Sequence, residues 1–258
     1  MDDLDTLGDD LVLLSVSPEG KLTTAQQIGF GLMGSELVRL AAAGRITITD
    51  GRVGVTDPSP CPDPMLDAAL ASLAGARRQV RAKWWVSHPR HHIGHVYLER
   101  LAAAGVLHAE RSNRLGIFPV TRWRVADPGR QAEAKARLDA IALSTGPVST
   151  AQAALAGLAH ATGLGTVLYP GRPNREIRSR LERIAKGGEV TAAVADAGAG
   201  DAASQAVAAT NQAVRAAADA ATQAAIDAAT SAAVHAATQA AHSAAHSAGH
   251  GGGGGHGH

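Results

Sequence analysis

Aromatic side chains occupy only the first two thirds of the chain, and this uneven distribution limits where a packed core can form. The aromatic residues all lie before residue 170: Phe30, Trp84, Trp85, Tyr97, Phe118, Trp123 and Tyr169. Between residues 201 and 250, 24 of the 50 residues are alanine, and the last ten are glycine and histidine. Alanine buries little apolar area per residue. We therefore expect the core of this 258-residue chain to come from about residues 4–186.

A few simple features bound the class of protein. The single cysteine, Cys61, excludes an internal disulfide framework and a cysteine-based zinc site. The acidic start Met-Asp-Asp-Leu-Asp is unlike the basic start of a signal peptide. Residues 140–171 contain no Asp, Glu, Lys or Arg, but Gly146-Pro147 and several polar residues interrupt this run. We expect a buried helix with loops there rather than a membrane span, and a cytoplasmic protein.

Charge is segregated along the chain. Residues 2–19 hold six acidic residues and no basic one, whereas residues 77–130 hold eleven Lys or Arg against three acids. From residue 187 onward, five acids accompany one Arg. The net charge of +8 in the middle segment indicates a surface for phosphates, on lipid or on nucleic acid. A solvated face in a chain rich in Arg and Ala is the alternative explanation.

The first third of the core predicts helices around a hairpin. The apolar run Leu7–Val16 predicts a helical turn followed by a strand-like segment. Thr23 or Thr24, with Gln26 or Gln27 three residues later, predicts a capped helix that ends near Gly44. Asp50-Gly51 between alternating apolar residues is a strong signal for a hairpin. Leu66, Leu70 and Leu73 then mark another helix.

The next third repeats this plan. Apolar spacing predicts a helix around Tyr97–Leu101 that ends at Gly105, followed by a second hairpin over 107–125 with a longer loop at 111–116. The hexapeptide Arg-Leu-Ala-Ala-Ala-Gly occurs at 39–44 and at 100–105. Its recurrence indicates an internally duplicated helix–hairpin unit, although any Ala-rich helix that ends at Gly would look similar.

The remaining core predicts further helices. We expect them at 131–143, at 149–161 and at 174–186, the second of which is nearly all apolar. Beyond residue 216, polar residues recur every four positions, which leaves no fixed apolar stripe on a helix. The fold class predicted is mainly α, with a helical-bundle core, one or two β-hairpins, and a low-complexity tail that is helical or disordered.

One segment concentrates groups that bind anions or metals. Lys83–His95 holds two tryptophans together with Lys83, Arg90, His91 and His95. His91 and His95 have the i, i+4 spacing of zinc ligands on a helix, but no acidic or cysteine ligand lies nearby. A basic surface or a phosphate site therefore fits better than a metal site.

Other chemistry finds little support. In the tail, His242, His246 and His250 recur every four residues, which makes them weak candidates for metal binding. Asp63 and Asp67 have i, i+4 spacing at a helix start, where helix capping explains them better than acid catalysis. No Walker, dinucleotide-binding or Gly-x-Ser-x-Gly motif is present. We therefore predict a non-enzyme with no cofactor.

Short motifs spread over the core resemble the Golgi phosphoprotein 3 family, in its form from high-GC bacteria. They come in this order along the chain: Leu7-Gly-Asp-Asp-Leu-Val-Leu-Leu, Glu19-Gly20, Ala43-Gly-Arg-Ile46, Asp57-Pro-Ser-Pro, Leu66-Asp-Ala-Ala-Leu70, Glu99-Arg-Leu, Gly105-Val-Leu107, Phe118-Pro-Val-Thr121 and Leu158-Ala-His-Ala161. The resemblance implies a mainly helical domain over 1–218, with its core at about 4–186 and a final helix at about 188–218. The tail at 219–258 lies outside it.

The resemblance also implies binding of phosphatidylinositol 4-phosphate and an adaptor role. The family's headgroup-pocket positions fall at about Thr24, Met33, His91 and Gly94, with Arg90 and His95 beside them. Because three of these four positions are neither basic nor aromatic, we expect weak selectivity for this lipid. With Lys83, the residues Arg90, His91 and His95 are the predicted headgroup ligands.

The family's membrane-contact hairpin corresponds to Ser112–Pro119, with Leu115, Ile117 and Phe118 as apolar contacts. Expected partners are anionic phospholipid or phosphoinositide headgroups on the inner face of the plasma membrane, adaptor clients, and a second copy of the chain through the hairpin. The competing hypothesis is a winged-helix-like nucleic-acid binder, with a recognition helix at 93–104 and a wing that carries four arginines.

Overall fold

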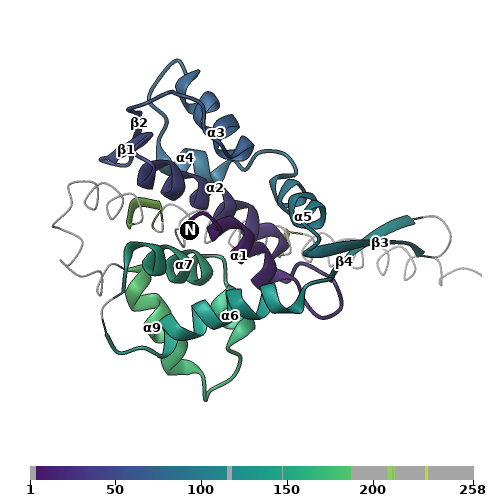
Figure 1. The fold of residues 1–258 in the computed structure, drawn as a ribbon. Helices are drawn as coiled ribbons and strands as arrows, with labels where there is room; N and C mark the ends of the chain where they lie inside the picture. Colours follow the sequence, from purple (N-terminus) through teal and green to yellow (C-terminus); the bar gives the residue numbers. More distant parts are fainter. Residues whose placement is uncertain are drawn as a thin grey trace, which may run out of the picture. The chain divides into compact units, whose positions relative to one another are not determined.

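Helices dominate the part of the chain that the computed structural model describes, namely residues 4–114, 118–146, 148–186, 208–210, 212 and 230–231. The chain divides into two compact units, Met1–Ala218 and Asp219–His258, and every labelled helix and strand belongs to the first. The helices are α1 (Leu7–Ser15), α2 (Ala25–Ala42), α3 (Pro64–Ala74), α4 (Ala82–Ser87), α5 (Ile93–Ala103), α6 (Pro128–Leu143), α7 (Thr150–Ala161), α8 (Leu164–Leu168) and α9 (Arg175–Ala185) (Figure 1).

The strands form two separate antiparallel hairpins within these described residues. β1 (Ile46–Thr49) pairs with β2 (Arg52–Val55), and β3 (Leu107–Arg114) pairs with β4 (Phe118–Val125). In Figure 1 the β3–β4 hairpin projects away from the helices, next to α5. The predicted class, a mainly helical core with two hairpins, is confirmed.

The buried helix α1 lies at the centre of the core, in contact with α2, α5, α6 and α7. Its apolar side chains from Leu11 to Leu14 are all buried, so no side of the helix faces water there. The prediction of a strand-like segment at Leu7–Val16 was wrong for this reason. A helix that is apolar all round has no 3.6-residue polar alternation, and a short apolar run then looks like a buried strand.

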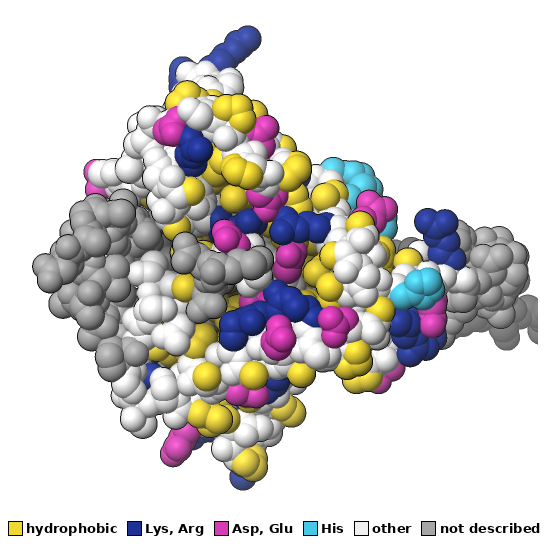
Figure 2. Space-filling view, in the orientation of Figure 1, with side chains coloured by type: hydrophobic (Ala, Val, Ile, Leu, Met, Phe, Trp, Pro, Cys, Tyr) yellow, Lys and Arg dark blue, Asp and Glu magenta, His cyan; other side chains and the backbone are white. Residues whose placement is uncertain are grey.

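Two consecutive acidic residues anchor α1 to the helices on either side of it. Asp10, almost fully buried, accepts hydrogen bonds from Arg130 at 3.0 Å and from Arg137 at 2.7 Å, both on α6. Asp9 pairs with Arg100 of α5 at 3.3 Å. On the face of the molecule shown in Figure 2, acidic and basic side chains alternate across the middle. The Leu-Gly-Asp-Asp motif therefore holds the helical core together.

Glycine lets the helices approach closely at two points. A Cβ on Gly8 of α1 would lie 2.4 Å from Cε1 of the buried Tyr97 on α5. A Cβ on Gly31 of α2 would lie 2.6 Å from Cγ2 of Thr162, which follows α7. Side chains at either position would push the helices apart, because real Cβ contacts are essentially never this short.

The two copies of the hexapeptide have the same local structure. Each ends a helix, and its glycine has a positive φ, 69° at Gly44 and 74° at Gly105. The following residue donates its N–H to the carbonyl five positions earlier, from Arg45 to Leu40 and from Val106 to Leu101. Each helix then enters a hairpin. The sequence repeat therefore corresponds to a repeated helix–hairpin unit.

The arginine that begins each copy of the hexapeptide binds the same carboxylate, that of Asp63. Asp63 accepts hydrogen bonds from Arg39 of α2 at 2.7 Å and from Arg100 of α5 at 2.9 Å, while its other oxygen accepts the N–H of Met65 and caps α3. Burial opposes the ionisation of Asp63, but the bonds from Arg39, Met65 and Arg100 outweigh burial and lower its pKa to about 2. The capping role predicted for Asp63 is confirmed, and its two ion pairs are additional.

The first hairpin, β1–β2, turns at Asp50-Gly51 as predicted. Thr49 pairs with Arg52, and the two turn residues have positive φ, 50° at Asp50 and 70° at Gly51. The second hairpin differs from the prediction, because pairing continues to Arg114 opposite Phe118. Most of the loop expected at 111–116 is therefore strand. The connecting residues 115–117 lie outside the described part.

Capping explains the ends of the later helices. Asp127 accepts the N–H of Arg130, so α6 begins at Pro128, before the predicted start at 131. The helix predicted at 149–161 is α7, and Ser149 and Gln152 form a capping box at its start, which was not predicted. Of the two predicted cap residues, Thr24 is the N-cap residue of α2, but its side chain makes no capping hydrogen bond. The short helices α4 and α8 were not predicted.

Candidate functional site

Residues 77–98, which we call the basic segment, contain no acidic residue. This segment runs from the end of α3 through α4 into α5. Its cationic residues are Arg77, Arg78, Arg81, Lys83 and Arg90, and its histidines are His88, His91, His92 and His95. Three of the four predicted headgroup ligands, Arg90, His91 and His95, flank the start of α5. Lys83 lies on α4.

The outer part of the basic segment presents free cations. The side chains of Arg77, Arg78 and Lys83 are exposed, and none of them has a hydrogen bond or ion pair to another described residue. Next to Lys83, Trp84 is 54% exposed and stacks on His88 with ring centroids 4.6 Å apart. An exposed tryptophan beside free cations is typical of a surface that meets the headgroup region of a bilayer.

Arg90 is held by a buried carboxylate rather than pointing free into solvent. It donates from Nη2 to Oε1 of Glu36, a residue of α2 whose side chain is 0% exposed. Its guanidinium also lies 6.0 Å from the ring centroid of Trp85. Burial raises the pKa of Glu36 to about 7, although Arg90 opposes that rise. Arg90 would therefore have to exchange Glu36 for a ligand.

The predicted histidines differ in their surroundings. His91 is exposed, and its ring meets that of His92 at 3.6 Å between centroids. His92 has a left-handed backbone, with φ 61°, where the chain turns into α5. His95 pairs with Glu99 at 3.2 Å and lies 5.6 Å from the ring of Trp123 on β4. Of the two predicted histidine ligands, His91 is the more available.

The remaining pocket positions implied by the family resemblance are Thr24, which precedes α2, Met33 on α2 and Gly94 on α5. Met33 is 1% exposed and belongs to the core. A Cβ on Gly94 would lie 3.9 Å from Ile28 of α2, and the hydroxyl of Thr24 is buried without a partner among the described residues. These positions supply neither a charge nor an exposed aromatic ring.

The apolar contacts predicted for the second hairpin fall mostly outside the described residues. Leu115 and Ile117 belong to residues 115–117, which the structure does not describe. Phe118 begins β4, and its side chain is likewise outside the described part. The membrane-contact role of these three residues stays a prediction.

Comparison with known proteins identifies the family. A model of the family described as Golgi phosphoprotein 3 (GPP34) matches residues 7–249. The chain belongs to the Golgi phosphoprotein 3 family. The matched range runs past residue 218, and the end of the domain at that residue stays a prediction. No curated protein sequence matches the chain.

The described residues of this family member offer neither a membrane span nor a metal site. Among its described helices, none has both the length and the apolar composition needed to cross a bilayer. Within the same residues, no three His, Cys, Asp or Glu side chains gather in a way that could hold a metal ion. The weak metal candidates His242, His246 and His250 lie outside the described part of the chain.

Sequence inspection missed Glu36, the buried partner of Arg90. It is the one acidic residue of α2, within the otherwise uncharged sequence Leu32-Met-Gly-Ser-Glu-Leu-Val38. A charged residue in an apolar helix needs a buried partner. That pattern indicates that Glu36 is paired. It does not identify the partner, Arg90, which lies 54 residues away in the sequence.

Proposed function

We propose that this member of the Golgi phosphoprotein 3 family is a peripheral membrane module that binds anionic lipid headgroups through its basic segment. The observation that carries the proposal is the acid-free run 77–98, with exposed Arg77, Arg78 and Lys83 beside the exposed Trp84. Each free cation near an anionic surface contributes about 1 kcal/mol. The tryptophan adds an amphipathic ring suited to the headgroup level.

The predicted ligands then divide into two groups. Lys83 and His91 are exposed and meet a headgroup without rearrangement. Arg90 and His95 are paired with Glu36 and Glu99, so they join only if a phosphate displaces those carboxylates. Phosphate offers more acceptor oxygens than a carboxylate, which favours such an exchange. Binding at the inner face of a plasma membrane, client proteins and self-association through the hairpin belong to the same proposal.

Charge reversal within the basic segment tests the proposal. We expect Arg78→Glu/Lys83→Glu to reduce co-sedimentation of the full chain with phosphatidylserine vesicles at 0.1 M salt. Raising the salt to 1 M shortens the screening length from about 10 Å to about 3 Å and should abolish binding of the unmodified chain. Trp84→Ala should also weaken binding at low salt. The contribution of Trp84 is not electrostatic, so charge reversal does not remove it. Lys21→Glu, an exposed lysine outside the segment, is the matched control.

Equal binding to neutral and anionic vesicles at low salt would contradict the electrostatic account. A gel shift with duplex DNA runs in parallel, since binding to DNA but not to vesicles would favour the winged-helix hypothesis. The same vesicles also measure selectivity. Because Thr24, Met33 and Gly94 offer no charge, we expect less than about a tenfold preference, 1.4 kcal/mol, for phosphatidylinositol 4-phosphate over phosphatidylserine at matched surface charge.

A further inference from the structure

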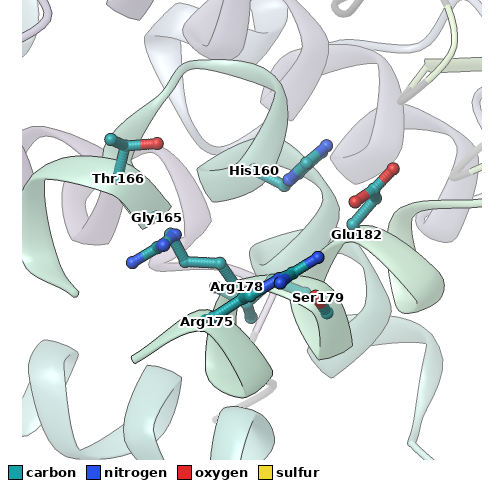
Figure 3. A pocket seen from close by; sticks show the side chains of 8 residues that line it. His160, Gly165, Thr166, Arg175, Arg178, Ser179 and Glu182 are labelled. Atoms are coloured by element: carbon teal, nitrogen blue, oxygen red, sulfur yellow. The ribbon is translucent and has the colours of Figure 1, made fainter. Parts of the chain in front are cut away.

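A hollow on the C-terminal side of the described core lies between α7, α8 and α9. It has a volume of about 250 Å³ and is lined by His160, Gly165, Thr166, Arg175, Arg178, Ser179, Leu181 and Glu182. Figure 3 shows Arg175 and Arg178 on α9, with His160 across from them on α7 and Thr166 on α8. Seven of these eight residues carry no apolar side chain, so the hollow is suited to a polar ligand.

Arg178 provides donors in a fixed position. Its Nη1 donates to the backbone carbonyl of Tyr169 and, at 2.8 Å, to that of Gly171. These two bonds hold the guanidinium plane, while Nε and Nη2 have no partner among the described residues. A guanidinium that is already oriented loses little freedom when it binds an anion.

Arg175 adds a second cation to the lining of the hollow. Its side chain is exposed and has no ion pair or hydrogen bond to another described residue. Arg175 is also the first residue of α9, and Asn174 before it makes no side-chain cap, so the partial positive charge of the helix N-terminus adds to the positive charge of Arg175. Two guanidinium groups with the hydroxyl of Ser179 match the several acceptor oxygens of a phosphate.

Glu182 gives the lining of the hollow an acidic group as well. Glu182 lies near His160 in Figure 3 and pairs with Lys186 at 2.6 Å. A carboxylate there repels a second phosphate and accepts hydrogen bonds from hydroxyl groups. The hollow is also smaller than the roughly 300–1,000 Å³ typical of sites for larger ligands.

From this arrangement we infer that the α7–α8–α9 hollow binds the phosphate monoester of a small polyol, with the phosphate on Arg175 and Arg178 and the hydroxyl groups toward Glu182. The ligand is either a soluble ester or the phosphorylated headgroup of a lipid. The site is separate from the basic segment and does not depend on the proposed membrane binding.

Calorimetric titration of the full chain with glycerol 3-phosphate tests the inference. We expect Arg175→Gln to weaken binding at least tenfold without changing the melting temperature, because Arg175 is exposed and unpaired within the described part. Arg172→Gln is the matched control, since it removes a nearby exposed arginine that does not line the hollow. It should change affinity less than twofold. Glycerol should not bind, and inorganic phosphate should bind at least threefold more weakly than the ester.

Three results would overturn the inference. They are absence of binding, equal weakening by Arg175→Gln and Arg172→Gln, and equal affinity for inorganic phosphate and the ester. Vesicles that contain phosphatidylinositol 4-phosphate distinguish the sources of the ligand. If Arg175→Gln weakens binding to them, the ester is a headgroup, and if it does not, the ester is soluble. Arg78→Glu/Lys83→Glu should leave titration with glycerol 3-phosphate unchanged, which separates this site from the proposed function.

Discussion

A buried charge in this protein can stabilise the fold and at the same time limit which cations of the candidate site are available to a ligand. Glu36 is fully buried, yet its partner Arg90 is 32% exposed and belongs to the acid-free basic segment. The pair therefore links the α2 core to the proposed membrane surface. Replacing a charge at either end changes both stability and the availability of a cation, so the two effects have to be measured separately.

Glu36 predicts a particular pH dependence of stability. Its pKa is about 7 in the folded chain against an ordinary 4.5, so its contribution to stability is full below pH 4.5 and is lost as pH rises to 7. The difference corresponds to roughly 3 kcal/mol. We expect Glu36→Gln to flatten the decline in unfolding free energy between pH 5 and pH 8, measured by urea denaturation.

The control for that experiment is Glu133→Gln, which removes an exposed carboxylate from α6. It should keep the slope of the unmodified chain. If Glu36→Gln also keeps that slope, the carboxylate of Glu36 does not titrate in this range. The same variant frees Arg90, so stronger vesicle binding by Glu36→Gln would place Arg90 among the headgroup ligands.

At the scale of the helices, turns and helix caps could be predicted from the sequence, whereas contacts between residues distant in the sequence could not. The Asp50-Gly51 turn and the cap at Asp63 each involve groups within a few residues of one another. The helical state of Leu7–Ser15 was missed because its burial depends on neighbours that are distant in sequence.

The candidate sites follow the same division. The positive charge over 77–130, and its dense part at Lys83–His95, could be predicted because these residues lie close together in the sequence. The pairing of Arg90 with Glu36 was not recognised, and neither was the hollow that joins His160 to Arg175 and Arg178. Which residues face one another across helices is decided by packing, and residue spacing within one helix carries no information about it.

Close packing between α2 and the end of α7 gives a prediction for Gly31. We expect Gly31→Ala to destabilise the protein by about 1–3 kcal/mol, because the new methyl would lie 2.6 Å from Cγ2 of Thr162. Thr162→Ser removes that methyl and keeps the hydroxyl that donates to Leu158. The double variant should therefore recover most of the loss in urea denaturation.

Gly29→Ala on the same helix is the matched control. Its Cβ would lie 3.4 Å from Pro89, an ordinary contact, so it should be neutral or stabilise by up to about 1 kcal/mol through helix propensity. Failure of Thr162→Ser to rescue Gly31→Ala would mean that the contact with Thr162 is not the source of the damage.

At the scale of the whole molecule, the boundary between the two compact units falls after Ala218. The Ala-rich remainder contains no aromatic residue, and its four-residue repeat keeps no fixed apolar stripe. We expect truncation after Ala218 to leave the melting temperature almost unchanged in a thermal scan. A fall of more than about 5 °C, on the order of 1 kcal/mol for this size, would show that residues 219–258 stabilise the fold.

The shared carboxylate of Asp63 has a consequence for how this protein can evolve. Two copies of a repeated unit ordinarily accumulate substitutions independently, but here Arg39 and Arg100 bind the same side chain. A mutation at Asp63 breaks an ion pair in both units at once, although Arg100 keeps its pair with Asp9, while a mutation at either arginine leaves the other pair with Asp63 in place. Arg39 and Arg100 are thus coupled through Asp63. We expect substitutions at these two positions to be correlated among related sequences.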